Sequence, residues 1–103
     1  MNKNPPSDQL NSLINSFKEK NFQKAEEIAL KITKNFSDHG LAWNILGLIL
    51  ERKNEFSKAL DAYQSAIKTS QNDPNLFYFY FNLGNSLQSL NRTKEAIENY
   101  EKS

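Results

Sequence analysis

The sequence predicts an all-α fold made of helical hairpins stacked one behind another. Apolar residues recur at spacings of three and four along most of the chain, which is the period of a helix face. Glycine and proline are scarce, at three each in 103 residues, and runs of β-branched residues are absent. The pattern also repeats, because segments of roughly 35 residues carry the same residue types at the same relative positions.

The clearest hairpin runs from Ala42 to Ile67. The apolar stripe of its first helix consists of Trp43, Leu46, Gly47 and Leu50. After a polar break at residues 53–55, the stripe of the second helix consists of Phe56, Ala59, Leu60, Tyr63, Ala66 and Ile67. Glycine inside a helix costs about 1 kcal/mol relative to alanine, so we expect a compensating contact at Gly47. The second helix should approach closely there, with the small Ala59 opposite the glycine.

A shorter copy of this hairpin precedes it. We expect residues 1–6 to be disordered and a helix to start after Pro5 and Pro6, with Ser7 or Asp8 as the N-cap. The stripe of this helix consists of Leu10, Leu13, Ile14 and Phe17. After a break at residues 20–21, the next stripe consists of Phe22, Ala25, Ile28, Ala29 and Ile32. Residues 36–40 then form the turn into the clearest hairpin.

A third copy follows it. Asp73 and Pro74 resemble a capping residue and a first helical residue. The stripe of the helix that they begin consists of Leu76, Tyr80, Leu83, Gly84, Leu87 and Leu90. We expect a break at residues 91–93 and a last, shortened helix with Ala96, Ile97 and Tyr100 on its stripe.

The copies can be tested by subtracting positions. Six pairs are separated by 37 residues: Trp43 and Tyr80, Leu46 and Leu83, Gly47 and Gly84, Leu50 and Leu87, Ala59 and Ala96, and Tyr63 and Tyr100. Three pairs are separated by 34: Phe22 and Phe56, Lys24 and Lys58, and Ala25 and Ala59. The first copy is one residue shorter in its turn and has Ile14 where the others have glycine.

These motifs resemble the tetratricopeptide repeat (TPR) family. Its pattern W-x-x-L-G-x-x-hydrophobic, then A-x-x-x-Y, then P, is matched by Trp43, Leu46, Gly47, Leu50, Ala59, Tyr63 and Pro74. The resemblance implies a right-handed α-solenoid over residues 7–103, with units at about 7–37, 38–73 and 74–103, the last truncated. Three residues more than in the family's unit of about 34 lie between Ala66 and Pro74. They lengthen the fourth helix or enlarge the loop after it, and the sequence leaves both open.

Composition argues against several classes of partner. Lys and Arg number 13 against 12 Asp and Glu, so no broad charge gathers nucleic acid or acidic lipid. The N-terminus lacks the apolar core of a signal peptide, and the longest apolar run, Ile45 to Leu50, is too short to span a bilayer. We therefore expect a cytoplasmic protein that binds neither nucleic acid nor membrane.

The sequence offers few residues that could catalyse a reaction or bind a metal or cofactor. The chain has no cysteine, and His39 is its only histidine, with no second histidine or carboxylate pair at ligand spacing. A phosphate-binding glycine loop and a nucleophile motif are also absent. We expect no catalytic, cofactor or metal site, and no enzyme activity in this chain.

The resemblance implies that the first helix of each unit lines a concave groove. On this basis the groove residues are Asn11, Asn15, Asn44, Leu48, Tyr78, Phe81, Asn85 and Gln88. Tyr78 and Phe81 either anchor a ligand or are covered by the extra residues upstream, whereas Tyr80, in the place of Trp43, and Phe77 should pack inside. The asparagines either bond a ligand backbone, as in TPR proteins resembling the protein O-glycosyltransferases, or are ordinary solvated side chains. Tyr78 and Asn82 stand where a co-chaperone clamp needs basic residues, so we do not expect binding to chaperone tails.

The sequence therefore predicts a protein-interaction module that presents its groove to an extended or helical segment of a protein or peptide partner. The alternative is the N-terminal TPR region of a larger enzyme, since similar arrays often precede a glycosyltransferase or sulfotransferase domain. Ile97 and Tyr100 have little chain after them to cover them, so we also expect weak self-association through this end.

Overall fold

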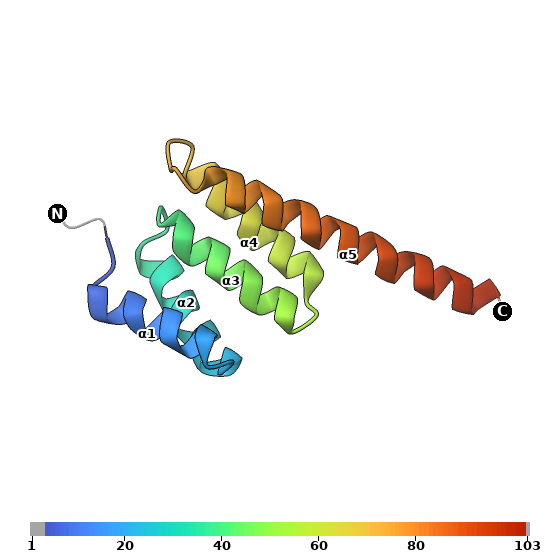
Figure 1. The fold of residues 1–103 in the computed structure, drawn as a ribbon, viewed down its shortest axis with the longest axis horizontal. Helices are drawn as coiled ribbons and strands as arrows, with labels where there is room; N and C mark the ends of the chain where they lie inside the picture. Colours follow the sequence, from blue (N-terminus) through green and yellow to red (C-terminus); the bar gives the residue numbers. More distant parts are fainter. Residues whose placement is uncertain (1–3, 103) are drawn as a thin grey trace.

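The computed structural model describes residues 4–102, and within this range the chain forms five helices. They are α1 (Ser7–Lys18), α2 (Phe22–Asn35), α3 (Gly40–Arg52), α4 (Phe56–Thr69) and α5 (Leu76–Lys102). Each helix packs against the next along the chain, and α5 also contacts α3. Figure 1 shows α1 to α4 as two hairpins side by side, with α5 lying along α4 and projecting well beyond it. The predicted all-α architecture of stacked helical hairpins is confirmed.

The same turn closes both hairpins. Lys20 and Asn54 have left-handed backbones, with φ of 62° and 63°. The N–H of Asn21 donates to the carbonyl of Ser16, and the N–H of Glu55 to that of Leu50, both at 2.9 Å. These bonds, together with the left-handed residue, end a helix and reverse the chain. The turns therefore fall where the polar breaks in the sequence predict them.

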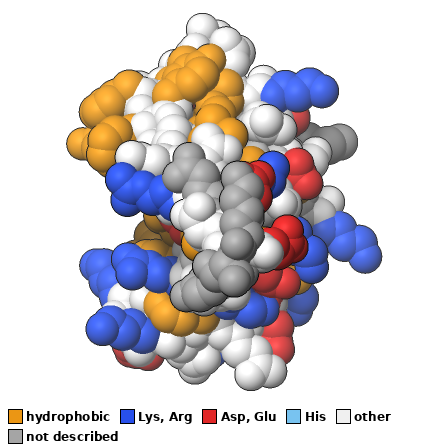
Figure 2. All heavy atoms as spheres, turned by 90° about the vertical axis from the view of Figure 1, so that its right-hand side faces the viewer, with side chains coloured by type: hydrophobic (Ala, Val, Ile, Leu, Met, Phe, Trp, Pro, Cys, Tyr) orange, Lys and Arg blue, Asp and Glu red, His pale blue; other side chains and the backbone are white. Residues whose placement is uncertain are grey.

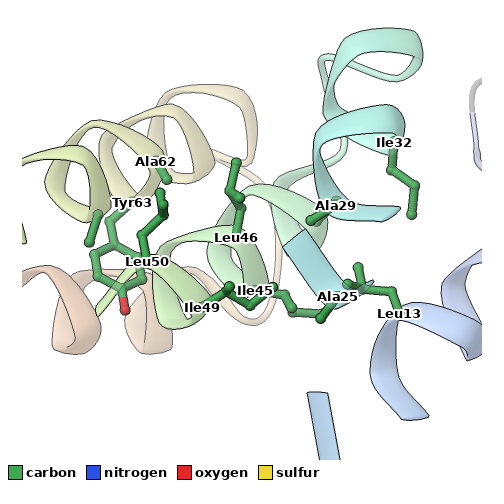
Figure 3. Close-up of a cluster of buried hydrophobic side chains, with 12 residues drawn as sticks. Leu13, Ala25, Ala29, Ile32, Ile45, Leu46, Ile49, Leu50, Ala62 and Tyr63 are labelled. Carbon is green, nitrogen blue, oxygen red and sulfur yellow. The ribbon is translucent and has the colours of Figure 1, made fainter. Parts of the chain in front are cut away.

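The core is centred on α3, and Figure 3 shows its buried side chains between those of α2 and α4, with Leu13 of α1 beside Ala25 of α2. The two helices of the second hairpin approach closely at Gly47, because a Cβ atom there would collide with the Tyr63 ring. The close approach is confirmed, but its partner is this ring and not Ala59. Tyr63 is fully buried, and its hydroxyl donates to Glu51 Oε2 at 2.9 Å. Burial first, and the bond to the Glu51 carboxylate second, raise the pKa of Tyr63.

The predicted break at residues 91–93 is wrong. Asn91 stands 37 residues after Asn54, yet α5 continues through it as one helix of 27 residues. Continuing α5 keeps the helical hydrogen bonds that a turn would break, and a separate helix would need a new and costly nucleus.

Two aromatic residues of α5 also differ from the prediction. Tyr80 and Phe77 were expected inside the molecule, but both are exposed, and the buried aromatic is Phe79. Within the described residues no second helix follows α5 to cover Tyr80, whereas its counterpart Trp43 of α3 is partly buried against the core. Phe79 belongs to the face of α5 that packs on α4, together with the fully buried Ser86, whose hydroxyl has no hydrogen-bond partner.

The extra residues before Pro74 enlarge the loop. α4 ends at Thr69 and is no longer than α2, while residues 70–75 form a connection longer than residues 36–39. Asp73 Oδ1 accepts from the N–H of Asn75 at 2.8 Å, and α5 begins at Leu76. The predicted Asp73-Pro74 helix start therefore lies two residues too early.

The N-terminal segment is partly described. Residues 1–3 lie outside the described residues, so the predicted disorder stays a prediction there, whereas Pro5 is buried. Pro6 holds the N-cap position of α1 without a side-chain hydrogen bond. The predicted cap at Ser7 or Asp8 is therefore wrong by one or two residues.

Candidate functional site

The eight predicted groove residues all lie on the first helix of a unit. Asn11 and Asn15 are on α1, Asn44 and Leu48 on α3, and Tyr78, Phe81, Asn85 and Gln88 on α5. This placement follows from the repeat, because equivalent positions of α1, α3 and α5 share the same register.

The four residues on α5 form one exposed line, which we call the groove face. Their spacings of three and four residues put them on the same side of the helix. Tyr78 is 53% exposed and Phe81 is 64% exposed, and Asn85 and Gln88 are exposed as well. Figure 2, which views the molecule from the C-terminal end of α5, shows hydrophobic side chains gathered along the upper edge of the molecule. The enlarged loop before α5 therefore leaves Tyr78 and Phe81 uncovered.

Asn44 takes part in a bond within the molecule. It is only 7% exposed, and its Oδ1 accepts a hydrogen bond from Asn82 Nδ2 at 3.0 Å. This bond links α3 to α5 beside the groove face. Sequence reasoning placed Asn44 and Asn82 near one surface but missed their mutual contact, since two amides 38 residues apart leave no local pattern.

The remaining groove residues are more widely spread. Leu48 is partly buried and lines a shallow hollow on α3 with Glu51, Arg52 and Asn54. Asn11 and Asn15 are exposed on α1, at the opposite side of the array from α5. A single groove that joins all eight residues stays a prediction.

His39 has a structural role that the sequence did not predict. It is the N-cap of α3, and its Nδ1 accepts from the N–H of Ala42 at 3.2 Å. Burial lowers the pKa of His39, and the nearby Asp73 carboxylate opposes this effect. The only signal in the sequence was its place directly before Gly40, where α3 begins. Among the described residues, no three His, Cys, Asp or Glu side chains are grouped so that they could hold a metal ion.

The length and polarity of the described helices show whether one of them could span a membrane. None of the helices in residues 4–102 is both long enough and apolar enough to cross a bilayer. α5 has the length, but polar residues occur throughout it.

Successive helical hairpins that pack only on their neighbours define an α-solenoid repeat protein. Family models of the tetratricopeptide repeat match residues 17–75 and residues 77–103. The chain belongs to the tetratricopeptide repeat family.

Three relatives show the similarity at the level of single proteins. The chain is 36% identical over 72 residues to the human protein O-mannosyl-transferase TMTC3, which is 70% of this chain and 7% of that protein. It is 38% identical over 55 residues to the peroxisomal targeting signal receptor of Saccharomyces cerevisiae, which is 53% of this chain and 8% of the receptor. With protein FlbA of Caulobacter vibrioides the identity is 37% over 46 residues, covering 45% of this chain and 8% of FlbA. The matched segments thus cover less than a tenth of the length of each of these relatives.

Proposed function

We propose that the chain is a protein-interaction module that holds an extended or helical segment of a partner along the groove face of α5. The observation that carries this proposal is the pair Tyr78 and Phe81, two aromatic side chains one turn apart that are each more than half exposed. Exposing such surface is unfavourable in water, and aromatic anchors contribute much of the energy at protein interfaces. Asn85 and Gln88 continue the line with amides that can bond a peptide backbone.

The surroundings of the groove face support the proposal. The bond between Asn44 and Asn82 holds α5 against α3, so a ligand would meet a preformed surface and lose less entropy on binding. One relative is by name a receptor for a targeting signal, which fits a peptide as the partner class. We propose a binding role and no catalytic one for this chain, and its localisation in the cytoplasm stays a prediction.

A peptide-display selection against the wild-type chain tests the proposal. Selected peptides should bind the Tyr78→Ala/Phe81→Ala double variant at least tenfold more weakly, as measured by isothermal titration calorimetry. Leu30→Ala is the matched control, because Leu30 is an equally exposed apolar residue on α2, away from the groove face. Peptides that bind the double variant as tightly as wild type, or that depend on Leu30, would contradict the proposal.

The second candidate function is the TPR region of a larger enzyme. The similarity over 72 residues to a human protein O-mannosyl-transferase favours this candidate. Sequencing the complete transcript tests it directly. A catalytic domain in the same reading frame would support it, and a stop codon directly after Ser103 would contradict it.

A further inference from the structure

A hollow lies between the first hairpin turn and the end of α3, and we call it the turn hollow. It has a volume of about 560 Å³ and is lined by Phe17, Lys18, Lys20, Phe22 and Arg52. The first four residues belong to the end of α1, the turn and the start of α2, whereas the arginine ends α3. Figure 1 shows both hairpin turns at the opposite end of α1 to α4 from the loop that begins α5. The turn hollow is therefore separate from the aromatic residues of the groove face.

Two phenylalanines form the apolar part of the turn hollow. The ring centroids of Phe17 and Phe22 are 5.7 Å apart in an edge-to-face arrangement, which is a favourable geometry for an aromatic pair. Both side chains pack against the core and are only partly buried. The pair is therefore a fixed apolar surface that solvent still reaches, and it can receive a large apolar side chain of a partner.

The rest of the lining is positively charged. Lys18, Lys20 and Arg52 are exposed, and none of them forms an ion pair with a residue that the structure describes. Lys18 and Arg52 are in the last turns of α1 and α3, where a cation offsets the helix dipole. That dipole is equivalent to only about half an elementary charge at a helix end, so positive charge is left over. Figure 2, which faces this end of the molecule, shows Lys and Arg side chains next to hydrophobic ones at its lower left.

The acidic side chains nearby do not neutralise the turn hollow. Glu51 accepts a hydrogen bond from the Tyr63 hydroxyl at 2.9 Å, and Glu26 is paired with Lys53 at 2.6 Å. Glu19 is exposed at the end of α1 but is not part of the lining. An anionic group that enters the turn hollow would therefore meet cations without a carboxylate between them.

The backbone and one ion pair hold the turn hollow in shape. The pair of Lys53 and Glu26 joins the end of α3 to α2, directly beside Arg52. Lys20 has its left-handed backbone, with φ of 62°, inside the closed first turn. A ligand would therefore find the apolar pair and the cations already placed around one hollow, and it would lose less entropy on binding.

We propose that the turn hollow binds an acidic segment of a partner protein, with one large apolar side chain of that segment against Phe17 and Phe22. A carboxylate next to this side chain would bond to Arg52, since the planar guanidinium matches a carboxylate with two parallel N–H groups. Further carboxylates would meet Lys18 and Lys20. Three cations are too few for the row of phosphate contacts that holds a nucleic acid, and a flat lipid surface does not enter a hollow between two units.

Titration with a defined peptide tests the proposal. The probe is Glu-Asp-Leu-Phe-Asp-Glu with both ends blocked, and Gln-Asn-Leu-Phe-Asn-Gln is its neutral counterpart. In the ¹⁵N-labelled chain, about 1 mM of the acidic peptide should change the amide chemical shifts most at residues 17–22 and 52. The neutral peptide should bind at least tenfold more weakly. The affinity for the acidic peptide should also fall at least tenfold between about 50 mM and about 500 mM salt, because salt screens exposed charges.

A variant without two of the cations, Lys20→Asn/Arg52→Gln, should bind the acidic peptide at least tenfold more weakly than wild type. Asparagine keeps the turn, since Asn54 has the same left-handed backbone in the second hairpin. Lys68→Gln/Arg92→Gln is the matched control, because it removes the same charge from exposed positions outside the turn hollow. This control should bind like wild type.

The groove-face variant Tyr78→Ala/Phe81→Ala should keep the affinity for the acidic peptide, so this proposal and the proposed function can fail separately. Absence of shift changes with the acidic peptide, or equal affinity for the neutral one, overturns the proposal. Equal losses in the two charge variants overturn it too, because the effect would then be one of net charge. Phosphatidylserine vesicles that displace the peptide, and that bind Lys20→Asn/Arg52→Gln no longer, would overturn a protein as the partner.

Discussion

His39 caps α3 through Nδ1, and this bond requires the nitrogen to carry no proton. Burial lowers the pKa of the folded imidazole below its usual value of 6.5. Between these two pKa values the unfolded chain binds more protons than the folded chain, so acid favours unfolding. The stabilisation by His39 is complete above about pH 6.5 and is lost as the pH falls through the lowered pKa.

We therefore expect His39→Asn, which keeps a capping side chain that does not titrate, to be less sensitive to acid than wild type. Urea unfolding at pH 7.5 and pH 5 measures the difference, and wild type should lose more stability between the two. His39→Ala should lose about 1 kcal/mol at pH 7.5, the usual contribution of an N-cap. An identical loss on acidification in wild type and His39→Asn would contradict the pKa argument.

At the scale of the helix, two glycines in the same repeat position have opposite environments. A side chain at Gly47 collides with the Tyr63 ring, whereas one at Gly84 meets open space. Gly47→Ala should therefore destabilise the fold by about 1–3 kcal/mol, as overpacking usually does. Gly84→Ala should stabilise α5 by up to about 1 kcal/mol through helix propensity alone. Urea unfolding of the two variants measures both effects, and the same sign for both would show that the two positions are packed alike.

The same glycines show which features a sequence predicts. Helix stripes, hairpin turns and repeat units follow from the spacing of Leu46, Gly47 and Asn54, because local periodicity and turn chemistry depend on residues near one another. The environment of Gly84 depends on whether the chain turns or continues as one helix after it, which is decided by a small balance between helix continuation and distant packing. The repeat register, which puts Asn91 37 residues after Asn54, therefore predicted turns at both positions where the structure has one only at Asn54.

The candidate site divides in the same way. The repeat register predicted that Tyr78, Phe81, Asn85 and Gln88 lie on one face, because they belong to a single helix. The contact between Asn44 and Asn82 joins two helices, so it depends on how far apart these pack. Such tertiary distances have no local signature in the sequence.

At the scale of the whole molecule, stability should fall along the array. A helix in a solenoid is stabilised only by its neighbours, and the end of α5 projects beyond α4 (Figure 1). We expect the amides of residues 94–101 to exchange hydrogen with solvent at least a hundredfold faster than those of residues 79–86 of the same helix. Hydrogen exchange followed by NMR tests this, and equal protection along α5 would contradict the unequal packing.

The fluorescence of Trp43 can be used to follow the middle of this array of helices. It is the only tryptophan, it is partly buried, and its indole N–H donates to the Ser37 carbonyl at 2.9 Å. Fluorescence from an indole depends on the polarity of its surroundings, so emission from this chain reports on the junction of α2 and α3. Opening of that junction should shift the emission to longer wavelength, while a change confined to the far end of α5 should leave the emission wavelength unchanged. An emission spectrum can therefore distinguish opening of the junction between α2 and α3 from a rearrangement at the far end of α5, without any added dye.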